Sequence, residues 1–66
     1  MSKKINISIL GMGYVGLPLA VEAGKYFETT GFDINKSKIE NLKKYIDQNN
    51  ELKKSDIKKS KFLKFT

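Results

Sequence analysis

INISILGMGYVGLPLAVEAGKYFETTGFD, residues 5–33, decides the fold of this chain. Isoleucines alternate with polar residues at its start, which predicts a β-strand from about Lys4 to Leu10. A glycine-rich turn at residues 11–16 comes next, and the apolar run from about Tyr14 to Tyr26 has the pattern of a helix packed on a sheet. A second short strand, from about Thr29 to Asp33, ends on an acid. This order of elements predicts a parallel βαβ unit.

The glycines of the turn have separate mechanical roles in such a unit. Gly11 permits the sharp turn from strand to helix, Gly13 lets the backbone approach a pyrophosphate, and Gly16 lets the helix pack closely on the strand. The helix N-terminus presents free N–H groups and a partial positive charge to phosphate. Asp33 follows Gly11 by 22 residues, close to the spacing of about 20 for an acid that binds a ribose. The motif therefore predicts a dinucleotide site.

The carboxylate of Asp33 also bears on which dinucleotide is bound. It can accept both hydroxyl groups of an adenosine ribose, whereas it would repel a 2′-phosphate. NAD is therefore favoured over NADP, although Lys36 and Lys38 lie near enough in sequence to leave NADP open. FAD binds to units of this kind as well, so the motif alone does not define the chemistry.

The remaining sequence continues the alternation of helices and strands. A capping-box pattern at Ser37 predicts a helix that runs to about Ile46, and a polar loop is predicted at residues 47–50. A short helix around Lys53 to Ser60 and a strand at Phe62 to Thr66 follow. We expect an α/β fold, a partial Rossmann domain of β-α-β-α-β order with a three-stranded parallel sheet of order 3-2-1. Residues 1–66 are then the amino-terminal part of an NAD-binding domain, without a complete second domain.

Composition narrows the classes of function. The 66 residues contain neither Cys nor His, which removes disulfides, thiolate metal sites, a cysteine nucleophile and the most common general base. We therefore expect no catalytic residue and no metal site in this chain. The net charge of +6 comes from 13 lysines without any Arg, whereas proteins that bind nucleic acids usually rely on Arg. The start of the sequence lacks the pattern of a signal peptide, so we expect a cytoplasmic protein.

Three segments carry a more specific resemblance: GMGYVGLPLA at residues 11–20, GFDIN at 31–35 and LKFT at 63–66. They closely resemble the amino-terminal end of the nucleotide-sugar 6-dehydrogenases, the UDP-glucose/GDP-mannose dehydrogenase family. The Gly-Tyr-Val-Gly-Leu-Pro form of the motif is most similar to the branch that acts on UDP-N-acetylhexosamines for capsular, Vi-type or O-antigen polysaccharides. The resemblance spans nearly the whole chain and implies NAD as the cofactor.

The resemblance also implies roles for particular residues and a reaction. The glycine turn would hold the pyrophosphate, Asp33 the adenosine ribose, and Lys38 matches a basic position beside the adenosine. The candidate cofactor-binding residues are Gly11, Met12, Gly13, Tyr14, Val15, Gly16, Asp33, Ile34 and Lys38. Family members oxidise the sugar C6 hydroxyl to a carboxylate with two NAD, through a cysteine thioester. That cysteine and the sugar-binding domain lie far downstream in the family, so this chain alone is expected to be inactive.

Two other functions stay open on the sequence. One is another NAD-dependent dehydrogenase, of the 6-phosphogluconate or β-hydroxyacid type, although those enzymes commonly read Gly-Leu-Gly-x-Met-Gly at the turn. The other is a small basic nucleotide- or RNA-binding module that uses the +6 charge. Our preferred prediction is that the chain binds NAD, and that a UDP-sugar binds only to the full-length enzyme. We expect the chain to bind neither nucleic acid nor a membrane. We also expect self-association through the strand at Ile5 to Leu10, whose outer edge would be unpaired.

Overall fold

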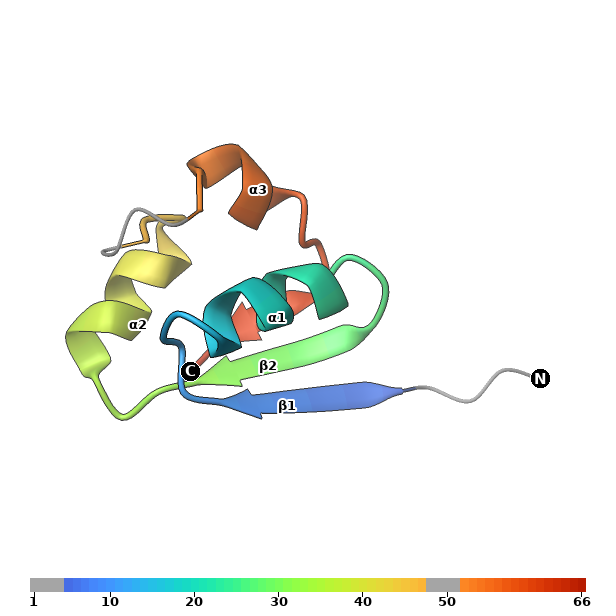
Figure 1. Ribbon diagram of the computed structural model, residues 1–66, viewed down its shortest axis with the longest axis horizontal. Helices are drawn as coiled ribbons and strands as arrows, with labels where there is room; N and C mark the ends of the chain where they lie inside the picture. Colours follow the sequence, from blue (N-terminus) through green and yellow to red (C-terminus); the bar gives the residue numbers. More distant parts are fainter. Residues whose placement is uncertain (1–4, 48–51) are drawn as a thin grey trace.

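The computed structural model describes residues 5–47 and 52–66, which form a three-stranded sheet with helices packed on it (Figure 1). The elements in chain order are β1 (Asn6–Leu10), α1 (Gly16–Ala23), β2 (Glu28–Phe32), α2 (Lys36–Lys43), α3 (Lys54–Lys58) and β3 (Leu63–Phe65). All strands are parallel, with β2 between β1 and β3. The predicted fold class and strand order are confirmed. Lys4 and residues 48–50, for which a strand start and a loop were predicted, lie outside the described residues.

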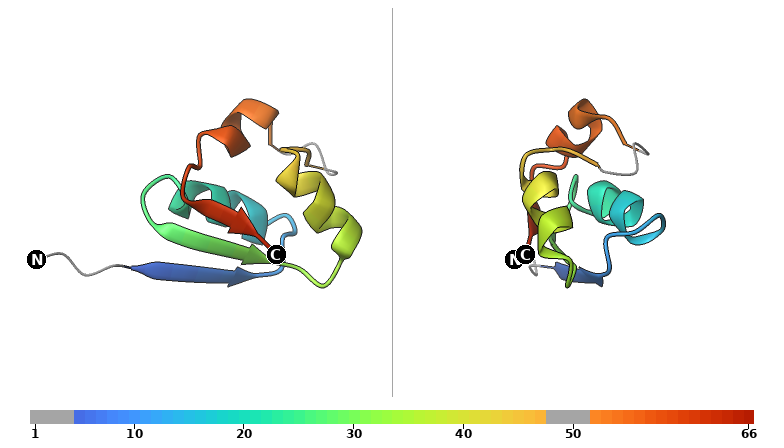
Figure 2. Two further views of the ribbon diagram at one scale, coloured as in Figure 1. Left: turned by 180° about the vertical axis from the view of Figure 1, so that it is seen from behind. Right: turned by 90° about the vertical axis from the view of Figure 1, so that its left-hand side faces the viewer.

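One face of the sheet is covered by the helices. Thr29 and Gly31 of β2 are buried, and the parallel register sets them beside Ile7 and Ile9 of β1. Side chains alternate between the faces of a strand, so these residues share one face. Seen from behind (Figure 2, left), α1 lies beyond the strands, on the far side of the sheet. The sheet is therefore open on the face that carries Ser8, which is exposed.

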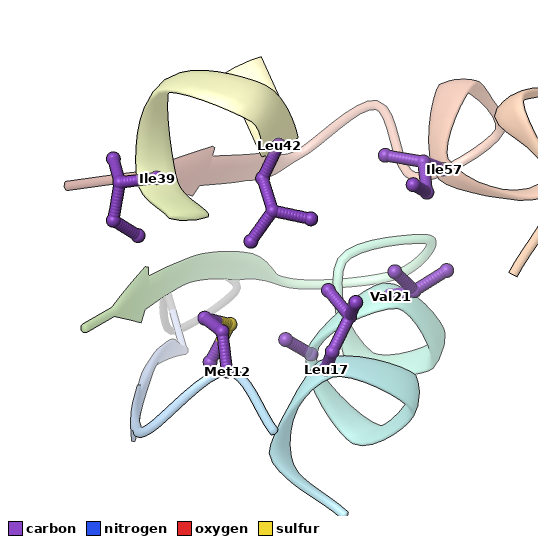
Figure 3. Packing of buried hydrophobic residues seen from close by; sticks show 7 residues of the cluster. Met12, Leu17, Val21, Ile39, Leu42 and Ile57 are labelled. Atoms are coloured by element: carbon purple, nitrogen blue, oxygen red, sulfur yellow. The ribbon is translucent and has the colours of Figure 1, made fainter. Parts of the chain in front are cut away.

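The core is a cluster of buried apolar side chains between this face and the helices (Figure 3). It consists of Met12, Leu17, Ala20, Val21, Ile39, Leu42 and Ile57. Every helix contributes to the cluster, and the loop after β1 contributes Met12. A Cβ on Gly31 would lie only 2.6 Å from the Met12 sulfur, so Met12 fills the space that a glycine in β2 leaves.

α1 is shorter than the predicted helix from Tyr14 to Tyr26. It ends at Ala23, because the next N–H groups bond three residues back instead of four: that of Lys25 donates to the Glu22 carbonyl oxygen at 3.2 Å and that of Tyr26 to the Ala23 carbonyl oxygen at 3.1 Å. A Cβ on Gly24 would collide with Ser60 Oγ and would lie 2.6 Å from Leu63 Cβ. The Ser60 hydroxyl, in turn, donates to the Val21 carbonyl oxygen at 2.7 Å. The segment that enters β3 thus passes directly against the end of α1.

α2 begins two residues earlier than the predicted capping box at Ser37 places it, so that capping box is wrong. Asn35 is the N-cap, and its side-chain oxygen accepts a hydrogen bond from the Lys38 N–H at 3.0 Å. Asn is among the strongest N-cap residues, so Asn35 competes well against Ser37 for this position. The start of α2 is thereby fixed only two residues after Asp33.

The close approach at Gly24 predicts a strong effect of a single methyl group. Gly24→Ala should lower the free energy of unfolding by about 1–3 kcal/mol, because the added Cβ overpacks the contact with Ser60 and Leu63. Gly13→Ala is the matched control: a Cβ there meets nothing within 4 Å, and we expect a change within about 0.5 kcal/mol. Urea denaturation followed by circular dichroism measures both values. Equal effects of the two substitutions would contradict the packing described for Gly24.

Candidate functional site

The loop between β1 and α1 leaves the sheet at the carboxyl ends of the strands. The Gly11 N–H donates to the Phe32 carbonyl oxygen at 2.6 Å, so β1 and β2 stay paired up to the first residue of the loop. Gly11 has φ +95°, a left-handed conformation that residues with a side chain rarely adopt. The chain therefore turns sharply at Gly11 and crosses the strand ends, where open parallel sheets bind their ligands.

The two later glycines of the motif have different surroundings. A Cβ on Gly16 would collide with the Gly11 carbonyl oxygen and would lie 3.6 Å from the Ile9 side chain. The first turn of α1 thus passes directly over the end of β1. A Cβ on Gly13, in contrast, would meet no other atom within 4 Å. Packing against Gly11 therefore explains why residue 16 is a glycine. At Gly13 no atom of the described residues fills the space next to the backbone, so this part of the loop is accessible to a ligand.

Unpaired N–H groups gather at this open side. Within the described residues, the N–H groups of Gly13, Tyr14 and Val15 donate no hydrogen bond. The first donor of α1 to find an acceptor is the N–H of Leu17, which bonds to the Gly13 carbonyl oxygen at 3.1 Å. Tyr14 and Val15 are largely exposed. The start of α1 therefore offers free donors, together with the positive end of the helix dipole, to an anion.

Asp33, the residue after β2, faces this loop. Its Oδ2 accepts a hydrogen bond from the Met12 N–H at 2.8 Å, and its Oδ1 accepts one from the Asn35 N–H at 2.9 Å. The side chain is 13% exposed. Each carboxylate oxygen has further acceptor capacity beyond one N–H. The two backbone donors thus orient the carboxylate and leave it able to accept ligand hydroxyl groups.

The charge of Asp33 is stabilised by the same contacts. The hydrogen bonds from the Asn35 and Met12 N–H groups, with a smaller contribution from the Lys38 ammonium, hold the pKa of the Asp33 carboxyl below its usual value. Lys38 Nζ lies 3.8 Å from Asp33 Oδ2. Asp33 is therefore ionised at neutral pH, with a cation beside it.

The structure brings together most of the predicted site residues. Two of them differ from the rest: the side chain of Met12 is buried, and that of Ile34 is almost fully exposed. Met12, Asp33 and Lys38 form one connected group, but the Met12 side chain points into the core (Figure 3), so only its backbone faces the site. Ile34 is 88% exposed beside Asp33. Sequence reasoning missed Asn35, which both orients Asp33 and caps α2. An Asn two residues after an acid and just before a helix is the signal that identifies it.

Residues 5–47 and 52–66 lack two other kinds of feature. No helix in these ranges has the length and apolar character needed to cross a bilayer. No three side chains of His, Cys, Asp or Glu in the same ranges lie in an arrangement that could hold a metal ion.

Comparison with known proteins places this arrangement among dehydrogenases. UDP-N-acetyl-D-glucosamine 6-dehydrogenase of Salmonella typhi is 48% identical over 63 residues, which are 96% of this chain and 15% of that protein. The enzyme of the same name from Pseudomonas aeruginosa is 44% identical over 64 residues, 97% of this chain and 15% of that protein. The structure of UDP-D-ManNAc dehydrogenase from Pyrococcus horikoshii superimposes with a TM-score of 0.85 at 27% identity, covering 94% of this chain and 16% of that one.

The chain thus spans about 15% of the length of the curated relatives that it matches. The model of the UDP-glucose/GDP-mannose dehydrogenase family, NAD binding domain, matches residues 5–66. That match includes the glycine loop, Asp33 and all three strands. The chain therefore belongs to the UDP-glucose/GDP-mannose dehydrogenase family, in the part of its members that binds NAD.

Proposed function

We propose that the loop after β1, the start of α1 and Asp33 hold the ADP half of NAD in an enzyme that oxidises the C6 hydroxyl of a UDP-sugar to a uronic acid. The observation that carries the proposal is the open backbone at Gly13, beside free N–H groups and an oriented carboxylate. The names of the Salmonella and Pseudomonas relatives support a UDP-N-acetylhexosamine as the sugar nucleotide. A role in bacterial surface polysaccharide synthesis and a cytoplasmic location belong to the same proposal.

Each residue of the site has a distinct task in this proposal. The N–H groups of Gly13, Tyr14 and Val15 donate to the pyrophosphate, which Gly13 lets approach closely. The Asp33 carboxylate accepts the hydroxyl groups of the adenosine ribose, and Lys38 lies beside that carboxylate and adds to the stabilisation of its charge. The exposed Ile34 side chain packs against the adenine. Bound NAD supplies the hydride acceptor for the sugar carbon.

Asp33 predicts the choice of cofactor. The chain should bind NAD more tightly than NADP by well over tenfold (about 1.4 kcal/mol or more), because a 2′-phosphate would meet a carboxylate. Asp33→Ala should reduce the difference between the affinities for NAD and NADP. Since the Asp33 pKa lies below its usual value, the affinity for NAD itself should not change through Asp33 between about pH 8 and pH 5. Titration of the isotope-labelled chain with each cofactor, followed by NMR at the amides of residues 13–15, measures these affinities.

Two variants serve as controls for that titration. Gly13→Ala should keep the fold and weaken NAD binding, because a Cβ blocks the pyrophosphate without touching the chain. Asp56→Ala, in α3, removes a carboxylate that caps Lys53 at 3.2 Å and should leave NAD binding unchanged. Equal affinity of the unaltered chain for NAD and NADP would refute the ribose role of Asp33. Undiminished binding by Gly13→Ala would refute the pyrophosphate role of the loop.

The 66 residues alone should not oxidise a sugar nucleotide. They include no Cys to form a thioester and no His to act as a general base. Incubation of the purified chain with NAD and UDP-N-acetylglucosamine should give no NADH absorbance above a buffer blank. NADH formation that persists after size-exclusion chromatography, which removes longer contaminating enzyme, would contradict this expectation.

We also infer that two copies of the chain associate through β1. The outer edge of β1 pairs with nothing among the described residues, the strand has no charged side chain, and Leu10 is 79% exposed. Such edges favour strand addition, and natural proteins often protect them with lysine. Sedimentation at micromolar concentration should therefore show a dimer that Ser8→Lys weakens, whereas Ser37→Lys on α2 has no effect. A monomer at all concentrations would contradict this inference.

A further inference from the structure

A hollow lies between α2, α3 and β3, and no residue of the glycine loop is among the described residues that line it. Its volume is about 410 Å³, and Leu42, Ile57 and Leu63 contribute apolar surface to it. Figure 2 (left) shows β3 with β2 on one side and with α2 and α3 on the other. β3 thus forms one wall of the groove, and the two helices with the turns that follow them form the rest. A hollow of this size is in the range that takes small organic ligands.

Four lysines converge on this groove from four different segments. Lys43 comes from the end of α2, Lys58 from α3, Lys61 from the turn that follows and Lys64 from β3. Among residues 5–47 and 52–66, no carboxylate lines the groove. Like charges brought together repel one another, and within the described residues none of the four lysines has an ion-pair partner. The groove is therefore complementary to an anion.

Tyr45 is held at the groove by an unusual backbone conformation. Its φ is +64°, and it directly follows the C-cap of α2, where its N–H donates to the Leu42 carbonyl oxygen at 2.9 Å. Gly or Asn normally occupies this left-handed position, because other side chains are strained there. The Tyr45 ring lies 5.5 Å from the Lys58 ammonium nitrogen and lines the groove. The strained residue thus sets an aromatic ring beneath one of the four cations.

We propose that this groove binds a chain of two or more phosphates. Lysine ammonium groups are compact point charges with three donors each, which suit phosphate oxygens around a single anion. The Tyr45 ring positions Lys58 through a cation–π contact. Single-stranded RNA fits the groove less well, because the chain has no Arg. Among the described residues that line the groove, only Tyr45 and Phe65 are aromatic, which is fewer rings than a row of stacking surfaces needs. The phosphates could belong to a free inorganic polyphosphate or to a nucleotide.

Inorganic tripolyphosphate is the first probe for this proposal. In NMR titrations of the labelled chain, the amides of Tyr45, Lys58, Lys61 and Lys64 should shift together, separately from the amides of residues 13–15. Lys58→Gln should weaken the binding of tripolyphosphate to the groove by about fivefold or more. Added sodium chloride should weaken the binding of tripolyphosphate to the unaltered chain as well, because salt screens the charges. Lys59→Gln is the matched control, because Lys59 is the next lysine along the chain and does not line the groove. It should change the affinity less than about twofold.

A second variant and a second ligand complete the test. Tyr45→Asn retains a residue that tolerates the left-handed conformation, so the urea midpoint should not fall, while tripolyphosphate affinity falls about threefold. ATP that binds more tightly than tripolyphosphate identifies a nucleotide as the source of the phosphates, and the reverse identifies an inorganic polyphosphate. Equal losses in Lys58→Gln and Lys59→Gln would overturn the proposal. So would shifts spread evenly over all lysines, or tighter binding of single-stranded RNA than of either phosphate ligand.

Discussion

The hydrogen bond from the Met12 N–H to the Asp33 carboxylate, 2.8 Å long, joins the glycine loop to the end of β2. Met12 also anchors the loop through its side chain, which is buried in the core against Gly31. A binding loop held by both the core and a neighbouring strand keeps its donors in a fixed place. The free N–H groups that follow Met12 are therefore presented to a ligand without a preceding rearrangement.

Asp33 is fixed from several directions at once. Its backbone N–H donates to the Thr66 carbonyl oxygen at 3.2 Å, its carboxylate accepts from Asn35, and the Lys38 ammonium lies beside it. The residue that we assign to the ribose is thus also the residue that connects β2, β3 and α2. In our proposal, the shape of the loop and the recognition of the ribose depend on the same carboxylate. We therefore expect a substitution at Asp33 to affect the shape of the loop as well as the choice of cofactor, and a substitution at Gly13 to affect ligand binding alone.

Sequence patterns predicted the parts of the structure that local rules determine. The glycine spacing was sufficient for the turn after the first strand, because each glycine has a steric reason. The alternation of strand and helix patterns along the chain was sufficient for the order of the elements and the strand order. The patterns failed where distant contacts decide. Burial of Met12 depends on the space at Gly31, and the left-handed Tyr45 depends on the end of α2. The groove lysines, apart along the chain, become neighbours only when β3 lies beside the helices.

Hydrogen exchange at single amides tests the anchoring of the loop most directly. In the chain without ligand, the Met12 N–H should exchange slowly, because it is bonded to Asp33 and lies over the core. The amides of Gly13, Tyr14 and Val15 should exchange rapidly, since they donate to no described residue. NAD should then slow these three and leave Met12 little changed. A Met12 amide that exchanges as fast as that of Tyr14 would show that the loop is not held by Asp33, which contradicts the account.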